Sequence, residues 1–332
     1  MLLIQPTTKG MNSLNPNDVS YWPTVSVIVP IYNGEEDLPD LLDCLTQQTY
    51  PKEKTEYFLV DNNSSDRTSD ILAIAVEKAN HEGLKFYHLT ENQIQSSYAA
   101  RNAGIKASKG EILVFTDMDC RPYPNWVEEI VKPFTNPSIG IVAGELIALP
   151  GNSLLEKYAE RAEIMAQKFL LEHPFCPYGQ TANLAILRDI FKKVGIFRPY
   201  LTTGGDADIC WRIQRETHYK IEYTPKAIIQ HRHRSHLKSF QSQLRRYGCS
   251  NRYLHELYGV KLMQECTTQD IVLGVSRWIV QDIPKKSIKL LLGRADWIDL
   301  IRTPIDLIGF QARSIGQKEA KLPQKAKQIE WL

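Results

Sequence analysis

Two aspartates form the first pattern in this sequence that could do chemistry. Asp117 and Asp119 follow the short run 111–115, which is apolar after its first residue and is typical of a strand buried in a parallel sheet. Side chains alternate along a strand, so both carboxylates can point to one side while Met118 points to the other. Two hard oxygen ligands suit Mg²⁺ or Mn²⁺ with a diphosphate better than zinc. An Asp-x-Asp triplet is also frequent by chance, so the pattern needs support elsewhere in the chain.

Strands that alternate with helices predict how this pair is positioned. Strands are expected at 25–29, where Pro30 closes the run, and at 57–60, 84–88 and 111–115, with a helix after each of the first three. This order indicates an α/β fold with a doubly wound, mostly parallel sheet. Ligands of such sheets lie outside the carboxyl ends of the strands, where Tyr32, Asp61 and the aspartate pair occur. For Asp61, a turn or helix-cap role stays open.

The second half of the sequence carries another pair of acids. Gly204 and Gly205 allow close approach of backbone to a ligand, and Asp206 and Asp208 follow at the start of an amphipathic helix. A simple cap is the alternative for Asp206. Before this segment we expect a strand at 139–147 and one long helix at 153–171.

Residues 227–255 contain no acid and several basic residues, among them Arg245 and Arg246. Apolar residues recur at helical spacing, so the basic side chains lie beside an apolar helix face. They either form a solvated surface or neutralise a diphosphate. We expect no nucleic-acid partner, because the helix has one aromatic pair and no platform on which bases could stack.

Composition adds bounds on location and cofactors. The chain of 332 residues is long enough for one large domain with an appendage, and its net charge of +2 favours no class of partner. Six scattered cysteines without a C-x-x-C pair indicate reduced thiols and a cytoplasmic protein. No apolar stretch reaches the ~18 to 20 residues that a membrane span needs, and the polar first twenty-odd residues lack the apolar centre of a signal peptide. A G-x-G-x-x-G motif is absent, which counts against a dinucleotide site.

The end of the chain is basic and has apolar residues at helical spacing. Between Lys285 and Lys327 there are ten Lys or Arg against four Asp or Glu, and Pro304 is predicted to divide the segment into two helices. Such helices either lie in a membrane interface or pack their apolar faces on the rest of the protein. Both interpretations stay open here.

Four stretches in order resemble the signatures of glycosyltransferase family 2 enzymes with the GT-A fold, of the bacterial, nucleotide-sugar-dependent type. They are Val25–Asn33, Val60–Asp66, Ala100–Gly104 and Phe115–Asp119, within a resemblance that covers roughly residues 24–250. The resemblance implies a nucleoside-diphosphate sugar donor, with a UDP-sugar expected first. It also implies a divalent metal, Mn²⁺ or Mg²⁺, and transfer with inversion to a hydroxyl acceptor, for which a lipid-linked molecule is one candidate.

The resemblance also implies roles for individual residues. Asp61 would bind the base, with Tyr32 and Glu35 beside it, and Arg101 and Asp117 would support the nucleotide. Asp119 would be the firmest metal ligand, with Asp117 and His231 completing the site. Asp206 would be the catalytic base, although Gly205 stands where relatives have glutamate. The acceptor or diphosphate side would comprise Asn183, Gly204, Gly205, Asp208, Arg245 and Arg246; an ordinary buried amide is an equal alternative for Asn183.

We therefore divide the sequence into three parts. They are a flexible segment 1–23, a GT-A catalytic domain 24–256 with a nucleotide-sugar half 24–120 and an acceptor half 121–256, and an amphipathic helical extension 257–332. We expect a cytoplasmic enzyme, with peripheral contact to the inner face of the membrane as a further option. The rival hypotheses are a catalytically silent sugar-nucleotide binding protein, which Gly205 favours, and a nucleotidyltransferase. The latter would need a glycine-rich basic loop after the first strand, where this chain is acidic.

Overall fold

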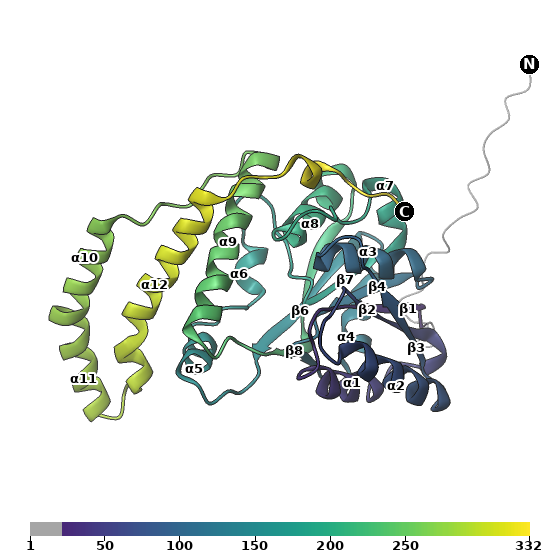
Figure 1. Cartoon of the computed structure of the whole chain (residues 1–332), viewed down its shortest axis with the longest axis horizontal. Helices are drawn as coiled ribbons and strands as arrows, with labels where there is room; N and C mark the ends of the chain where they lie inside the picture. The colour runs from purple at the N-terminus through teal and green to yellow at the C-terminus, as the bar shows by residue number, and fades with distance from the viewer. Residues whose placement is uncertain (1–21) are drawn as a thin grey trace, which may run out of the picture.

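The computed structural model describes residues 22–332, so most of the predicted segment 1–23 lies outside the described residues. Eight strands of the described part form one sheet in the order β3-β2-β1-β4-β7-β6-β8-β5 (Figure 1). The strands are β1 (Val25–Ile31), β2 (Thr55–Asp61), β3 (Lys85–Thr90), β4 (Ile112–Thr116), β5 (Cys120–Pro122), β6 (Ile139–Ala148), β7 (Asn183–Leu187) and β8 (Lys220–His231).

The predicted fold class is confirmed. Strands β3, β2, β1 and β4 are mutually parallel, β6 and β8 are parallel to each other, and β7 and the edge strand β5 pair antiparallel with their neighbours. The helices that precede β8 are α1 (Leu38–Thr46), α2 (Thr68–His81), α3 (Ser97–Ala107), α4 (Trp126–Val131), α5 (Leu154–Arg161), α6 (Lys168–Leu171), α7 (Phe191–Val194) and α8 (Gly205–Glu216). They cover both faces of the sheet (Figure 1).

Alternation along β1 shows how the two faces are filled. Val25, Val27 and Val29 point into a cluster formed with α1, α2 and α4. Ile28 points into the opposite cluster, formed with α3, α7 and α8. All four side chains are fully buried, so the sheet is the middle layer of a three-layer core.

Two predicted boundaries are wrong. Strand β1 does not end at Pro30 but continues to Ile31; pairing with β4 has already stopped at Ile28, so Pro30 needs a partner only on the β2 side. The predicted long helix 153–171 is two short helices, α5 and α6. The chain leaves the helical path at Glu163, whose φ is 49°, and buried Gln167 then bonds the backbone of Gln180 and Asn183.

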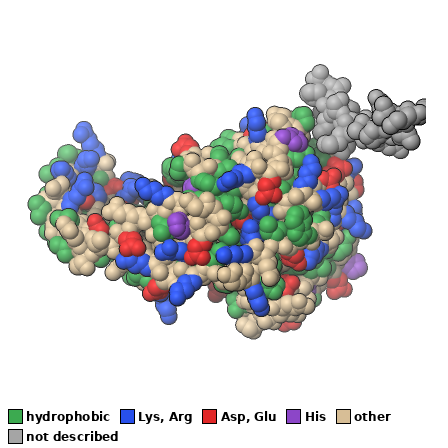
Figure 2. Space-filling view, turned by 90° about the horizontal axis from the view of Figure 1, so that it is seen from above, with side chains coloured by type: hydrophobic (Ala, Val, Ile, Leu, Met, Phe, Trp, Pro, Cys, Tyr) green, Lys and Arg blue, Asp and Glu red, His purple; other side chains and the backbone are tan. Residues whose placement is uncertain are grey.

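The helices after β8 form a second body. They are α9 (Leu237–Tyr258), α10 (Thr268–Arg277), α11 (Ile283–Leu291) and α12 (Trp297–Glu319), with a π-helical turn at Trp278–Asp282. Helix α12 runs parallel to α9 with near-contact of the two backbones, because Gly248 and Gly316 lack the Cβ that would strike the facing helix. Helices α10 and α11 pack on the other side of α12 and form the projecting end of the molecule (Figures 1 and 2).

Pro304 does not divide the segment, contrary to the prediction, but lies inside α12. The break comes at Gly293, whose φ is 66°, and a new capping box of Asp296 and Asp299 then starts α12. Proline cannot donate to the carbonyl four residues earlier, and that carbonyl, of Leu300, accepts instead from the indole of Trp278 at 2.6 Å. A side chain from the π turn therefore replaces the missing helical bond.

After α12 the chain returns to the sheet and the helices that flank it (Figure 1). The amide of Ile196 donates to the carbonyl of Glu330 at 2.7 Å, and Asn102 donates to the Glu330 carboxylate at 2.6 Å. The predicted division at residue 256 stays a prediction, since α9 packs along α12 and the last residues rejoin the sheet domain. Among the described residues, no helix combines the length and apolar character that crossing a bilayer requires.

Candidate active site

The carboxyl ends of β1, β2 and β4 bring the predicted residues to one edge of the sheet. Asp61 lies opposite Ile31 in the register of β1 and β2, so Tyr32, which follows Ile31, is its neighbour across the strands. Asp117 follows the end of β4 on the other side of β1. The sheet therefore places the three strand ends together, as the sequence predicted.

Hydrogen bonds fix the two loops that follow β1 and β2. Asp61 Oδ1 accepts from the amide of Ser64 at 3.0 Å, and Glu35 Oε2 accepts from the amide of Arg67 at 3.0 Å. Asn33 Oδ1 accepts from the amide of Ser65 at 2.8 Å. The turn role that was left open for Asp61 is thus present, while the Tyr32 side chain stays half exposed.

Asp117 and Asp119 do not extend β4 as the sequence analysis expected. The strand ends at Thr116, and a turn leads into β5. Arg101 Nη2 donates to Asp117 Oδ1 at 2.5 Å, whereas Asp119 faces His231 Nε2 at 3.4 Å and Arg234 at 3.5 Å. Because the chain turns between them, the two carboxylates have different partners and do not share one side of a strand, as the sequence analysis expected.

Three side chains could hold a cation. A ligand atom each from Asp119, Cys120 and His231 lies within 4.8 Å of the others, and the pairing of β5 with β8 places Cys120 opposite His231. Burial, and then the charge of Asp119, raises the pKa of Cys120 well above its ordinary value. Sulfur is also a soft ligand, which suits neither Mn²⁺ nor Mg²⁺. Asp119 and His231 remain, which fits Mn²⁺ or Mg²⁺ with other positions left for phosphate and water oxygens. Asp117 is outside this set.

The acidic start of α1 holds this turn in place. Arg121 donates to Asp37 at 2.8 Å, to Asp40 at 3.0 Å and to the carbonyl of Cys120 at 2.9 Å. Arg232 also pairs with Asp37, at 2.9 Å. The acids that follow Tyr32 in the sequence therefore fix the basic segment next to the cation-binding side chains.

Asp206 lies in the first turn of α8 and is half buried. Thr181 Oγ1 donates to Asp206 Oδ1 at 2.7 Å. Burial raises the pKa of Asp206 above the usual aspartate value; the charge of Arg101 and the Thr181 hydrogen bond oppose this, and the charge of Asp117 adds to it. Arg101 therefore acts electrostatically on both Asp117 and Asp206, which joins the two acid pairs of the sequence in one site. A carboxylate with a raised pKa is suited to accept a proton near neutral pH.

Gly204 and Gly205 shape the entry to α8. Gly204 has a φ of 81°, which a residue with a side chain rarely adopts. The amide of Gly205 donates to the Tyr98 hydroxyl at 2.9 Å, and a Cβ at Gly205 would lie 2.6 Å from the Tyr98 ring. Tyr98 thus fills the space that a side chain at position 205 would need.

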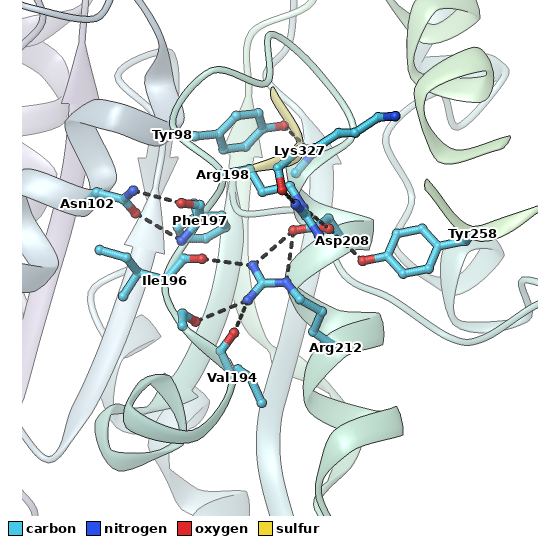
Figure 3. Close-up of polar contacts among 12 residues, drawn as sticks. Tyr98, Asn102, Val194, Ile196, Phe197, Arg198, Asp208, Arg212, Tyr258 and Lys327 are labelled. Atoms are coloured by element: carbon cyan, nitrogen blue, oxygen red, sulfur yellow. Dashed lines mark hydrogen bonds and ion pairs between the residues drawn. The ribbon is translucent and has the colours of Figure 1, made fainter. Parts of the chain in front are cut away.

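Asp208 is a correction to the sequence analysis, which placed it on the acceptor side. Its carboxylate is fully buried and accepts from Arg198 at 2.8 Å, Arg212 at 2.9 Å and Tyr258 at 2.5 Å (Figure 3). Arg212 also donates to backbone carbonyls between Val194 and Ile196, as Figure 3 shows. All these contacts are made inside the protein, so Asp208 links α8 to α9 and to the loop between α7 and α8.

Asn183 and Arg245 already have partners within the protein, whereas the role expected of Arg246 stays a prediction. Asn183 is fully buried: its Oδ1 accepts from the Trp126 indole at 2.8 Å, and its Nδ2 donates to two backbone carbonyls. Asn183 is therefore an ordinary buried amide, which was the alternative left open by the sequence. Arg245 pairs with Glu319 of α12, and Arg246 is exposed without an ion pair to a described residue.

The sequence analysis counted Arg232 and Arg234 only as members of the basic segment that could neutralise a diphosphate, and it did not find Thr181 or Tyr98. Arg232 and Arg234 lie in the predicted basic segment, but right after His231, where β8 ends, and not on the helix. Proximity in sequence to His231 was the indication that could have found them. Thr181 and Tyr98 gave no such indication, because their contacts with α8 are made only in three dimensions.

Comparison with known proteins adds independent findings. The protein-family model described as "Glycosyl transferase family 2" matches residues 26–195, just over half of the chain. Glycosyltransferase AglE of Haloferax volcanii is 37% identical over 186 residues, which are 55% of this chain and 59% of AglE. A Methanococcus voltae protein, dolichyl N-acetyl-alpha-D-glucosaminyl phosphate 3-beta-D-2,3-diacetamido-2,3-dideoxy-beta-D-glucuronosyltransferase, is 22% identical over 244 residues, 68% of this chain and 72% of the relative.

A solved structure has a similar fold. It is the mannosyltransferase PcManGT of Pyrobaculum calidifontis in complex with GDP-Man and Mn²⁺, with a TM-score of 0.62 and 17% identity. The similarity covers 92% of this chain and 89% of that protein. It therefore extends beyond the sheet to the helices after β8.

Proposed function

Because this chain belongs to glycosyl transferase family 2, we propose that it is an inverting, metal-dependent glycosyltransferase that moves a sugar from a nucleoside-diphosphate sugar to an acceptor hydroxyl. The observation that carries the proposal is the position of Asp206. This carboxylate has a raised pKa and shares the field of Arg101 with Asp117, at the edge of the sheet where Asp119 and His231 could hold a cation.

The reaction would be a single displacement. The acceptor oxygen forms a bond to the anomeric carbon while the bond from that carbon to the diphosphate oxygen breaks on the opposite face. The acceptor proton passes to a carboxylate oxygen of Asp206, which Thr181 orients. Attack opposite the leaving group inverts the anomeric configuration. The products are the glycoside and the nucleoside diphosphate.

Other residues would bind the donor. Asp61, Tyr32 and Glu35 line the nucleotide end, and Arg101 with Asp117 lies toward the ribose and phosphates. A divalent cation on Asp119 and His231 would supply charge neutralisation for the departing diphosphate. Arg234, close to Asp119, would add positive charge. The Mn²⁺ and GDP-Man bound by PcManGT support a metal and a nucleotide sugar, so a GDP-sugar belongs beside UDP-sugars in any donor panel.

The acceptor we propose is a hydroxyl on a lipid-linked glycan, used at the cytoplasmic face of the membrane. The support is the printed name of the Methanococcus voltae relative, which describes a dolichyl phosphate-linked sugar as acceptor. A catalytically silent sugar-nucleotide binding protein is the second candidate, favoured by Gly205 and by the Tyr98 ring that occupies the space beside it. The loop after β1 is acidic, whereas a nucleotidyltransferase would need a glycine-rich basic loop there.

A donor panel separates these candidates. Release of nucleoside diphosphate from UDP- and GDP-sugars would be measured with and without acceptor extract, with Mn²⁺ or with chelator. An enzyme releases the diphosphate from one donor in the presence of metal and acceptor. Donor binding without release under any condition would contradict the proposed transferase and support the binding protein.

A further inference from the structure

Large hydrophobic side chains are exposed on one stretch of the chain far more than elsewhere. Among the described residues, 22 such side chains are exposed, and ten of them lie between positions 272 and 297. They are Val272, Leu273, Val275, Ile279, Val280, Ile288, Leu290, Leu291, Leu292 and Trp297. Val275 lines a groove with Pro304 and Leu307 of α12. We call the other nine, which include Trp297 at the start of α12, the outer face of α10 and α11. Figure 2 shows hydrophobic and basic side chains together at this projecting end.

The other side of the same helices is already used for packing. A Cβ at Gly274 would meet the Leu307 side chain at 2.7 Å, Trp278 donates to the carbonyl of Leu300, and Thr303 donates to Asp282 at 2.7 Å. Contacts with α12 therefore fix the helices and direct the outer face away from the protein. Val280 is 72% exposed and Leu291 is 88% exposed, so the protein itself covers neither.

The two alternatives that the sequence left open apply to different helices: packing on the protein applies to α12, and an unpartnered apolar face applies to α10 and α11. Ile298 and Ile305, which the sequence grouped with the amphipathic segment, are buried against α5 and α9, so α12 packs on the protein. The outer face of α10 and α11 has no such partner. A cluster of exposed apolar side chains on a water-facing surface marks an interaction site.

Charge identifies the partner class. Residues 283–294 hold four basic residues and no acid. Lys285, Lys289 and Arg294 are exposed, and none of them forms an ion pair with a described residue. Two copies of this chain that met through α11 would bring these like charges together, which disfavours self-association. Exposed apolar side chains between unpaired lysines and arginines match the boundary between acyl chains and anionic headgroups.

We propose that the outer face of α10 and α11 docks this protein on the surface of a bilayer that contains anionic phospholipid. The apolar side chains insert at the level of the headgroups, and the basic side chains contact the phosphates. The helices lie along the surface, because none of the described helices can cross it. The inference rests on exposure and charge alone and holds whichever donor the active site uses.

A vesicle flotation experiment with the full chain tests this. Vesicles of phosphatidylcholine alone are compared with vesicles that contain phosphatidylglycerol, at low and high salt. We expect binding to the anionic vesicles that salt weakens. Lys285→Ala and Lys289→Ala should each lower the partition coefficient about fivefold. Leu291→Glu together with Val280→Glu should lower it by at least about tenfold.

Matched controls come from α2. Ile74 is 68% exposed there, and Lys78 is exposed on the same helix, so Ile74→Glu and Lys78→Ala change the same kinds of side chain away from the outer face. Both should leave vesicle binding unchanged. Sedimentation velocity without lipid, with circular dichroism melts, shows whether each variant is folded and monomeric. Wild type that ignores anionic vesicles overturns the proposal, and so does wild type that dimerises and is made monomeric by Leu291→Glu without any lipid binding.

Discussion

Replacing Asp208 by asparagine separates a structural carboxylate from a catalytic one. The Asp208 carboxylate is fully buried between the guanidinium groups of Arg198 and Arg212, which are themselves largely buried. Asp208→Asn keeps the shape but removes the negative charge, so two buried cations lose their counter-ion. Breaking a buried pair in this way costs about 3 to 5 kcal/mol. We therefore expect the free energy of unfolding to fall by that amount.

The assay combines urea unfolding, thermal melts and transfer kinetics below the melting temperature. In domains of 150 to 250 residues a loss of 1 kcal/mol lowers Tm by roughly 2 to 4 °C, so the melt should shift by on the order of 10 °C. Tyr258→Phe removes one hydrogen bond to the same carboxylate, at 2.5 Å, and should cost about 1.5 to 3 kcal/mol. The folded Asp208→Asn variant should keep kcat within a few-fold. Unchanged stability together with lost transfer would refute the structural assignment.

Three further predictions concern the metal, the pH profile and α12. Chelator should stop transfer. Asp119→Ala should weaken donor binding measured by calorimetry, whereas Cys120→Ser should leave donor binding unchanged. Tight, metal-dependent donor binding by Asp119→Ala would count against the proposed cation site. Since burial raises the pKa of Asp206, kcat should fall as pH drops through a value above the usual aspartate pKa of ~4. Thr181→Val removes a hydrogen bond to the ionised carboxylate and should move this fall in kcat to still higher pH. A fall in kcat at the same pH in wild type and variant would exclude Asp206 as the base. Trp278→Phe should cost about 1 kcal/mol in urea unfolding, and Pro304→Ala in the same chain should recover most of it by restoring a helical donor; additive costs would contradict the replacement bond.

The sequence predicted those features that depend on local pattern and chain order. Apolar runs and helical spacing located β1 to β4 and the helices between them, and the rule for parallel sheets placed Tyr32, Asp61 and Asp117 at one edge. The four signatures then led to the family that the comparisons show. These successes share one cause: each needs only neighbouring residues or the order of strands.

The failures involve contacts between distant residues. Asp208 follows the same local pattern as Asp206, and only the positions of Arg198 and Tyr258 in space show that one carboxylate is enclosed while the other stays accessible. Arg245 looked like part of a basic surface until Glu319 was found beside it. Pro304 broke a sequence rule because Trp278, 26 positions earlier, supplies the missing donor. No pattern in the local sequence encodes such partners.

The most direct test of the proposed mechanism is to measure transfer and donor binding by Asp206→Asn side by side with wild type. Asparagine keeps the size of the side chain and can still bond Thr181, but it cannot take the acceptor proton. The account predicts a loss of about 10²- to 10⁴-fold in transfer with donor affinity nearly unchanged. Near-normal turnover by this variant, or a loss of donor binding equal to the loss of transfer, would contradict the role of Asp206 as the base.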